Sequence, residues 1–293
     1  MEVIRASVMG FCMGVQRAVD KAEQALDEAS AQEGGSGKVY SLGPLIHNPT
    51  VLSDFEKRGL SILSPDGTGF PFLQGASVII RAHGTTPLVM EELEKAGARV
   101  IDATCPKVHL SQKRAGEWAA KGYDIVIAGD RNHGEVTSIS SFARARQASG
   151  GQVVVVQNAA EAERLLLSDR CVLIAQTTFS PAEFDRIRSV LEKKTGGIRV
   201  FNSICSATME RQEALGELAE KVEGIVVVGG TSSANTRRLY ERAKSLVPLA
   251  DLIEDASALK EAFFRLERVG ITAGASTPEA VVKEVEERLL SGS

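Results

Sequence analysis

Short apolar runs, polar loops and amphipathic helical stretches follow one another in the same order along all 293 residues, and this pattern limits the possible folds. Runs such as 124–128 and 224–228 are too short for a buried helix and apolar enough for a strand covered on both faces. Strands of this kind that alternate with helices predict βα units. We therefore expect an α/β fold with small, mainly parallel sheets.

Six of the apolar runs end in polar loops of similar composition. The loops are rich in Gly, Ser, Thr, Asn and His, and four of them end in a Pro that suits the first turn of a helix. They span residues 42–49, 81–87, 129–136, 175–181, 229–236 and 272–278. Ligands of open parallel sheets bind at the carboxyl ends of the strands, so we expect these loops to carry the functional groups.

Three of the four cysteines divide the chain into thirds. Cys12 and Cys105 are 93 residues apart, and Cys105 and Cys205 are 100 residues apart. The last third closes on the N-terminal strand, and each third holds two of the six loops. Self-similarity at a fixed period indicates repeated units, here three α/β domains in a pseudo-threefold trefoil around a central cavity. The expected domains are residues 13–104, 105–204, and 205–293 together with 1–12.

Charge and hydropathy exclude several classes of function. The net charge is −4 and no long run of Lys or Arg occurs, which argues against a nucleic-acid partner. No apolar stretch reaches about 18 residues, so no membrane span is expected. Residues 1–10 lack the basic and apolar regions of a signal peptide. We therefore expect a cytoplasmic protein with reduced cysteines.

The cysteines differ in their surroundings. Cys12, Cys105 and Cys205 each lie at a strand-to-helix turn among small residues, whereas Cys171 opens an apolar run and is expected in the core. Three thiolates from distant segments suit zinc, Cu(I) or an iron–sulfur cluster. No CxxC spacing supports a zinc ribbon or a ferredoxin-type site. A 4Fe–4S cluster with three cysteine ligands would keep one iron open for a substrate.

The loops also hold groups suited to phosphate and to proton transfer. Three of the four histidines fall in the first three loops: His47, His83 and His133. Hydroxyls and amides at helix starts bind phosphate, although each alone is an ordinary N-cap: Thr177, Thr178, Ser232, Ser233, Asn235, Ser276 and Thr277. Glu135 is the one carboxylate in HGEV, which favours proton delivery from a dry pocket. No GxxxxGK[ST] or convincing GxGxxG motif supports a P-loop or a Rossmann cofactor.

Nine short motifs follow one another along the chain: GFCMGVQRAV, LIHNPTVL, AHGTTP, DATCPKV, NHGEV, QTTFS, CSATMERQEA, SANTRRL and TAGASTPE. This ordered set, from about residue 3 to residue 290, resembles the 4-hydroxy-3-methylbut-2-enyl diphosphate reductase family. The family catalyses the last step of isoprene biosynthesis by the methylerythritol phosphate pathway. The resemblance implies an oxidoreductase of trefoil fold that converts its allylic diphosphate to isopentenyl diphosphate and dimethylallyl diphosphate.

The resemblance also implies a cofactor and an electron donor. The cofactor is one 4Fe–4S cluster with three cysteine ligands and an open iron site, found as 3Fe–4S once the fourth iron is lost. Cys12, Cys105 and Cys205 match these ligands. The chain shows no second cluster motif and no flavin motif, so we expect ferredoxin or flavodoxin to supply the electrons.

The remaining site residues follow from the same motifs. Glu135 matches the family's proton-relay residue, His133 the neighbouring binding histidine, and Thr177 and Thr178 the threonine pair near the substrate hydroxyl, with the contacting member left open. The diphosphate-binding set is matched by His47, His83, Ser233, Asn235 and Ser276.

One loop departs from the family pattern. The family often has Ser-Ser-Asn in the fifth loop, but a register anchored on NTRRL (235–239) gives Ser233, Ala234 and Asn235. A register one residue earlier would pair Ser232 with Ser233 and misalign Asn235, so we prefer the first. The backbone N–H of Ala234 would still bind phosphate.

Two other functions compete with the reductase. A zinc hydrolase or lyase would use the three thiolates and Glu135 as a base, and its anaerobic preparation would be colourless rather than brown. A non-catalytic iron–sulfur sensor would not need the histidine and hydroxyl set, and it would not bind an allylic diphosphate tightly.

Overall fold

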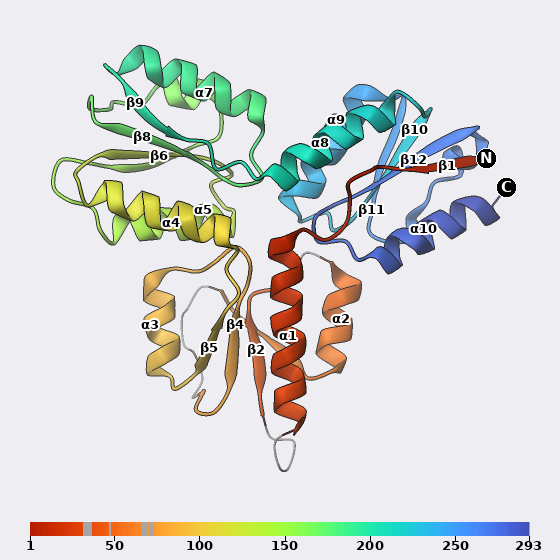
Figure 1. The fold of residues 1–293 in the computed structure, drawn as a ribbon, viewed down its shortest axis with the longest axis horizontal. Coiled ribbons are helices and arrows are strands. Elements are labelled where there is room, and N and C mark those ends of the chain that lie inside the picture. The colour runs from red at the N-terminus through yellow and green to blue at the C-terminus, as the bar shows by residue number, and fades with distance from the viewer. Residues whose placement is uncertain (32–36, 47, 66–69, 71–72, 293) are drawn as a thin grey trace. The chain divides into compact units, whose positions relative to one another are not determined.

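The computed structural model describes residues 1–31, 37–46, 48–65, 70 and 73–292. Within these residues the strands form three sheets of four strands, and every strand pair is parallel (Figure 1). The expected α/β class with small parallel sheets is therefore confirmed. The trefoil arrangement and its central cavity stay a prediction.

The described residues fall into two compact units. The first comprises Met1–Gln16, Ile46–Arg58 and Ser206–Ser293, and the second comprises Arg17–Leu45 and Gly59–Cys205. One sheet lies in the first unit and two lie in the second. The boundaries expected at residues 13–104, 105–204, and 205–293 with 1–12 stay predictions.

Sheet A belongs to the first unit and has the strand order β1-β12-β10-β11. Its strands are β1 (Glu2–Arg5), β10 (Gly224–Val228), β11 (Leu249–Ile253) and β12 (Arg268–Ala273). The other elements of this unit are α2 (Pro49–Lys57), α8 (Ser206–Ala219), α9 (Ala234–Leu246), η1 (Ala256–Ala258), η2 (Glu261–Arg265) and α10 (Glu279–Ser291). The N-terminal strand thus completes the sheet of the C-terminal third, as the sequence predicts.

Sheet B belongs to the second unit and has the order β3-β2-β4-β5. Its strands are β2 (Val39–Leu42), β3 (Leu60–Leu63), β4 (Ser77–Ile80) and β5 (Arg99–Asp102). The helix α3 (Pro87–Lys95) joins β4 to β5, and the helix α1 (Met13–Ala31) precedes β2. The inner strand β4 is buried from Val78 to Ile80, which suits a sheet covered on both faces.

Sheet C is the other sheet of the second unit and has the order β7-β6-β8-β9. Its strands are β6 (Asp124–Ala128), β7 (Val153–Val156), β8 (Cys171–Ala175) and β9 (Ile198–Phe201). Its helices are α4 (Pro106–Ala119), α5 (Gly134–Arg144), α6 (Ala159–Glu163) and α7 (Pro181–Lys194). Helices α4 and α5 cover one face and α7 covers the other (Figure 1).

The three sheets share one topology. In each sheet an edge strand is followed by a cysteine: β1 by Cys12, β5 by Cys105 and β9 by Cys205. The strand paired with this edge strand is β12, β4 or β8, and a polar loop follows it. The three cysteines therefore occupy equivalent places at the carboxyl ends of their sheets.

Local sequence explains how the helices that follow the loops begin. Asn48, Thr86 and Ser180 cap α2, α3 and α7 by accepting a hydrogen bond from a backbone N–H in the first turn. A Pro follows each cap, where its missing N–H costs nothing. Among the described helices, none is both long and apolar enough to cross a membrane.

Candidate functional site

The three cysteines share one backbone contact. The N–H of Cys12 donates to the carbonyl of Ala275 at 3.2 Å, and that of Cys105 donates to Ala82 at 3.0 Å. The N–H of Cys205 donates to the carbonyl of Thr177 at 2.8 Å. Each acceptor lies in the loop that follows the paired inner strand, so the same geometry occurs in all three sheets.

The cysteine side chains suit a soft metal centre. Cys12, Cys105 and Cys205 form no disulfide with a described residue and are half-buried, whereas Cys171 is buried in the core of sheet C as predicted. Burial, with a smaller contribution from Asp124, raises the pKa of the Cys171 thiol to about 12, so this thiol is a poor ligand. The other three thiols are of the kind that binds iron–sulfur clusters.

The described residues do not gather three metal-binding side chains of His, Cys, Asp or Glu around one point. Cys12 belongs to the first unit, and Cys105 and Cys205 belong to the second. The donor set fits a cluster by its chemistry and by its equivalent positions, and the meeting of the three sulfurs stays a prediction.

Glu135 is the second residue of α5 and is buried. The backbone N–H of Thr177 donates to Glu135 Oε1 at 2.6 Å, and Thr177 Oγ1 donates to Oε2 at 2.7 Å. Hydrogen bonds to both oxygens stabilise the charged carboxylate and fix its orientation. The structure thus brings Thr177, and not its neighbour Thr178, against the carboxylate.

Two histidines lie beside this carboxylate. His133 caps α5, because its Nδ1 accepts a hydrogen bond from the N–H of Glu135 at 3.3 Å. The ring of His83 meets the His133 ring edge to face, with centroids 4.8 Å apart and an interplanar angle of 72°. Loop 81–87 and the start of α5 are thereby held together.

These contacts form one continuous path through the second unit. Cys105 bonds to the residue before His83, the His83 ring contacts His133, and His133 caps the helix that carries Glu135. Thr177 then joins the Glu135 carboxylate to the backbone of Cys205. Two of the expected cluster ligands are therefore linked through the expected proton-transfer residues.

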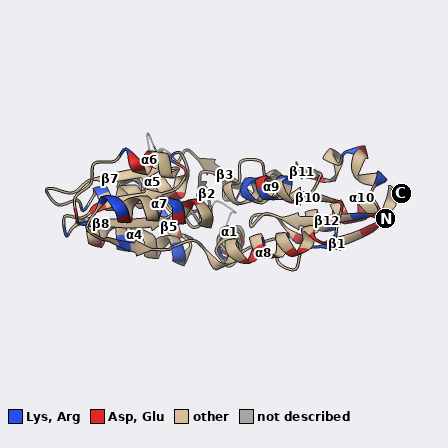
Figure 2. Cartoon of the chain, turned by 90° about the horizontal axis from the view of Figure 1, so that it is seen from above, with Lys and Arg blue, Asp and Glu red and all other residues tan. Residues whose placement is uncertain are grey.

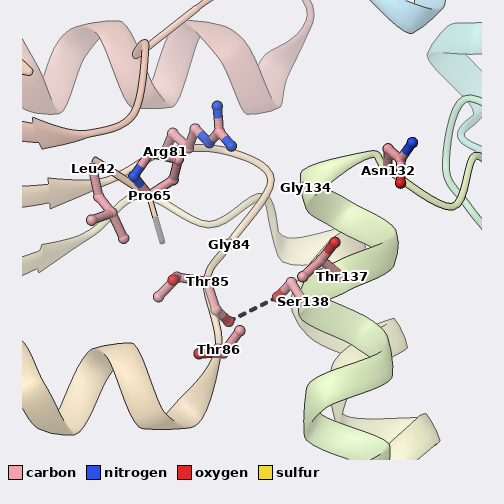
Figure 3. Close-up of a pocket in the computed structure, with 10 residues that line it drawn as sticks. All are labelled: Leu42, Pro65, Arg81, Gly84, Thr85, Thr86, Asn132, Gly134, Thr137 and Ser138. Carbon is pink, nitrogen blue, oxygen red and sulfur yellow. Dashed lines mark hydrogen bonds between the residues drawn. The ribbon is translucent and has the colours of Figure 1, made fainter. Parts of the chain in front are cut away.

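A polar cavity of about 190 Å³ lies beside this path. Arg81, Thr85, Thr137 and Ser138 are among the residues that line it (Figure 3). Ser138 Oγ donates to the carbonyl of Thr85 at 2.9 Å, the bond drawn in Figure 3 between the loop and α5. Burial lowers the pKa of Arg81.

The loops of the first unit carry the other polar groups. Ser233 caps α9, Ala234 and Asn235 open its first turn, and all three residues are buried. Among the described residues, no group accepts a hydrogen bond from Asn235 Nδ2. Ser276 is buried in the loop after β12. A helix start with a spare amide donor suits an anion.

Comparison with known proteins places the chain in a family. A family model described as LytB protein matches residues 3–290. The chain belongs to the LytB family.

Curated relatives of this LytB chain share one name, 4-hydroxy-3-methylbut-2-enyl diphosphate reductase. The protein of Treponema denticola is 41% identical over 299 aligned residues, which cover 100% of both chains. That of Aquifex aeolicus is 38% identical over 290 residues, which cover 99% of this chain and 96% of the relative.

Two solved structures resemble the LytB chain. A structure of (E)-4-hydroxy-3-methyl-but-2-enyl diphosphate reductase, the terminal enzyme of the non-mevalonate pathway, superposes with a TM-score of 0.71 at 38% identity and covers 99% of this chain and 100% of its own. The E-1-hydroxy-2-methyl-but-2-enyl-4-diphosphate reductase from Plasmodium falciparum gives a TM-score of 0.85 at 27% identity, with 98% and 87% covered.

Sequence reasoning missed two buried polar residues of the LytB chain, Gln176 and Gln112, and the closely packed Gly84. Gln176 donates to Thr178 Oγ1 at 2.9 Å and accepts from the N–H of Asp130 at 2.8 Å. Gln112 donates to Ser138 Oγ at 2.6 Å, and Gly84 packs so closely there that a Cβ would lie 2.5 Å from Gln112 Nε2. The position of Gln176 beside the threonine pair was the available signal. The expected site residue His47 lies outside the described residues.

Proposed function

We propose that this chain is a 4-hydroxy-3-methylbut-2-enyl diphosphate reductase. It removes the allylic hydroxyl of (E)-4-hydroxy-3-methylbut-2-enyl diphosphate as water, consumes two electrons and two protons, and releases isopentenyl or dimethylallyl diphosphate. Membership of the LytB family over residues 3–290 supports this reaction. The observation that carries it is the path from Cys105 to Cys205 through Glu135 and Thr177.

The cofactor is one 4Fe–4S cluster held by Cys12, Cys105 and Cys205, with one iron left open. When bound, it supplies the electrons and a Lewis-acidic position for the substrate hydroxyl. The three cysteines are half-buried and form no disulfide with a described residue, which supports this assignment, and so does their equivalent placement. Cys171 is not a ligand, because it is buried within sheet C.

Glu135 holds the proton that the leaving hydroxyl needs. In the ionised state its carboxylate accepts both hydrogen bonds from Thr177. Once Glu135 is protonated, the Thr177 hydroxyl turns to accept from the carboxyl and donates its own proton towards the substrate oxygen. His133 fixes the start of α5 and thereby the position of Glu135.

The diphosphate gives remote binding energy that orients the reacting end of the substrate. Ser233, Asn235 and Ser276 bind it together with the first N–H groups of α9. The resemblance of their motifs to those of the family adds His83 and His47 to the diphosphate-binding residues. Thr178 lies beside Thr177 and is held by Gln176.

Electrons come from ferredoxin or flavodoxin, and the reaction takes place in the cytoplasm. The donor assignment rests on the sequence, which shows no second cluster motif and no flavin motif, and the cytoplasmic location stays the expectation from the sequence. A donor-coupled assay and cell fractionation test them directly.

The experiment that tests the function is an anaerobic purification, followed by iron and sulfide analysis and an assay with a chemical reductant. We expect a brown protein that converts the allylic hydroxy diphosphate to the two products. Cys12→Ser, Cys105→Ser and Cys205→Ser should each lose iron, whereas Cys171→Ser, the matched control, should retain it. A colourless, zinc-loaded protein without reductase activity would refute the proposal in favour of a hydrolase or lyase.

A further inference from the structure

The second unit carries a surface on which cations cover aromatic rings. We call it the aromatic–cation face. It consists of Arg114, Trp118, Lys121, Tyr123, Arg170, Arg199 and Phe201. All seven residues belong to sheet C, to its helix α4 or to the turns that enter its strands. Figure 2 shows Lys and Arg in blue along α4.

The cations of this face are held in place. Lys121 Nζ lies 4.3 Å from the centroid of the Trp118 ring, and Arg199 Cζ lies 4.6 Å from the same ring. Arg170 Cζ lies 4.6 Å from the centroid of Tyr123, which meets Trp118 edge to face at 4.7 Å. Cation–π contacts of this length stabilise a fixed charge position.

The other end of the face has the same construction. Arg114 Cζ lies 4.7 Å from the centroid of the Phe201 ring. That ring lies 6.3 Å from the Trp118 ring, so the aromatic side chains are contiguous. Hydrogen bonds from Arg199, and then from Arg170, lower the pKa of Tyr123, consistent with a positive local field.

The positive charge of the face is not neutralised within the described chain. None of Arg114, Lys121, Arg170 and Arg199 forms an ion pair with a described carboxylate. Glu117, on the same helix, is paired with Lys113 at 3.9 Å. The whole chain carries a net charge of −4, so the aromatic–cation face is a positive patch on a negatively charged protein. A local patch of this kind attracts and orients a partner of opposite charge.

The construction favours a carboxylate-rich protein over a nucleic acid. Single-stranded nucleic acids bind by stacking their bases on open aromatic faces. Here the cations already lie over the faces of Trp118, Tyr123 and Phe201. What the surface offers is a set of guanidinium and ammonium donors on a rigid aromatic support, which suits carboxylates.

The face reaches the elements that carry two of the cysteines. Phe201 ends β9, and Cys205 follows four residues later, a chain length of at most about 14 Å. Arg114 lies on α4, whose first residue follows Cys105 directly. A partner seated at the Phe201 end therefore lies close to the backbone that leads to Cys205.

We propose that the aromatic–cation face is the docking surface for an acidic electron-carrier protein, whose redox group is surrounded by carboxylates. This inference rests on the proposed function, because it requires a centre that is reduced from outside. Each turnover oxidises two one-electron-reduced carriers. The two electrons and two protons then replace the allylic C–O bond of the substrate by a C–H bond: one proton leaves with the hydroxyl as water, and the other is added to carbon.

The test compares two reductants on one variant. Arg114→Gln, Lys121→Gln, Arg170→Gln and Arg199→Gln are combined in the iron-loaded protein. The matched control removes four exposed lysines of the first unit: Lys221→Gln, Lys244→Gln, Lys260→Gln and Lys283→Gln. Both proteins and the wild type are assayed with dithionite and methyl viologen, and separately with reduced flavodoxin across a range of salt concentrations.

We expect the dithionite rate to be the same in all three proteins. The flavodoxin-supported kcat/KM should fall about tenfold or more in the face variant and lose most of its dependence on salt, while the control stays near wild type. An unchanged flavodoxin rate and salt dependence in the face variant would overturn the docking proposal. Tight binding of a single-stranded RNA oligonucleotide to the face, with unchanged flavodoxin kinetics, would overturn it in favour of a nucleic-acid partner.

Two further measurements distinguish a failure of the proposed function from a failure of the docking proposal. If wild-type protein shows no activity with dithionite, the proposed function fails, and flavodoxin binding to the iron-loaded protein still tests the face. If the fourfold variant loses iron, the single variants Lys121→Gln and Arg199→Gln replace it, because both side chains belong to exposed residues. Each should lower the flavodoxin rate by a smaller factor, and wild-type rates in both would contradict the proposal.

Discussion

The loops of sheet C and those of sheet A both bury polar groups, but only those compared in sheet C are fully hydrogen-bonded. In sheet C, Glu135 is 1% exposed, and Thr177 donates to both of its carboxylate oxygens. In sheet A, Asn235 is 5% exposed, but its Nδ2 finds no acceptor among the described residues. A buried donor without a partner costs about 1–3 kcal/mol. Satisfied groups orient a reaction, whereas unsatisfied groups await a ligand.

The contrast arises on one topology. Both sheets have four parallel strands in the same order, and in both a cysteine N–H donates to the loop of the neighbouring strand. We therefore propose that a few loop residues decide whether a sheet end serves proton transfer or anion binding. The predictions below test this division.

The largest effect is expected for Glu135→Gln. Thr177 directs two donors at this side chain, and a glutamine offers one acceptor oxygen and one amide that would face a donor. Turnover with a chemical reductant should fall by about 10²–10⁴-fold, the usual contribution of general acid–base catalysis. Iron content should match wild type. Wild-type turnover in this variant would remove Glu135 from proton delivery.

The next effect is expected for Thr177→Val, compared with Thr178→Val, which instead removes the acceptor of Gln176 Nε2. Thr177→Val leaves the buried Glu135 carboxylate with one donor fewer, which should lower the free energy of unfolding by about 1–3 kcal/mol. Turnover should fall with it. Chemical denaturation and initial rates measure the two quantities. Equal losses of turnover in the two variants would show that the carboxylate does not distinguish these threonines.

Asn235→Ala tests the anion-binding role expected for the loops of sheet A. Asn235 Nδ2 donates no hydrogen bond to a described residue, so its removal breaks none of the described contacts. The free energy of unfolding should therefore stay unchanged or rise. The KM for the diphosphate should rise about tenfold, equivalent to about 1.4 kcal/mol. Asn235→Asp, of the same shape but negatively charged, should raise KM further. A destabilised protein with an unchanged KM would make Asn235 a structural residue.

The smallest effect is expected for Ala234→Ser, which adds a hydroxyl to the first turn of α9. One more neutral donor near the diphosphate should lower KM about threefold, less than 1 kcal/mol. Steady-state kinetics with a chemical reductant would measure it. A raised KM would indicate that the buried site lacks room for the hydroxyl.

The repeating pattern made much of the fold predictable. Parallel strands, helix starts with Pro and the place of β1 follow from local signals, such as the caps at Asn48 and Ser180. The core position of Cys171 followed from its apolar run. Each of these features depends on residues close in sequence, or on a period that recurs along the chain.

The finer geometry of the site was not predictable in the same way. Thr177 and Thr178 are adjacent hydroxyls of the same type, and only the path of the chain after β8 brings one of them to Glu135. Gln112 and Gln176 look like ordinary polar residues in sequence, yet both are buried and hold site loops. Their importance comes from contacts between segments that no local pattern encodes.

The pairing of β1 with β12 has a consequence for how this protein is made. Strand β1 is synthesised well before β12 and cannot pair until β12 has been made, and Arg5 forms ion pairs with Glu279 and Glu286 of α10. Sheets B and C close from continuous stretches of chain and need no such delay. A polypeptide terminated before β12 would leave Cys12 behind an unpaired strand. The place of Cys12 at the end of sheet A is therefore set only once β12 has been made.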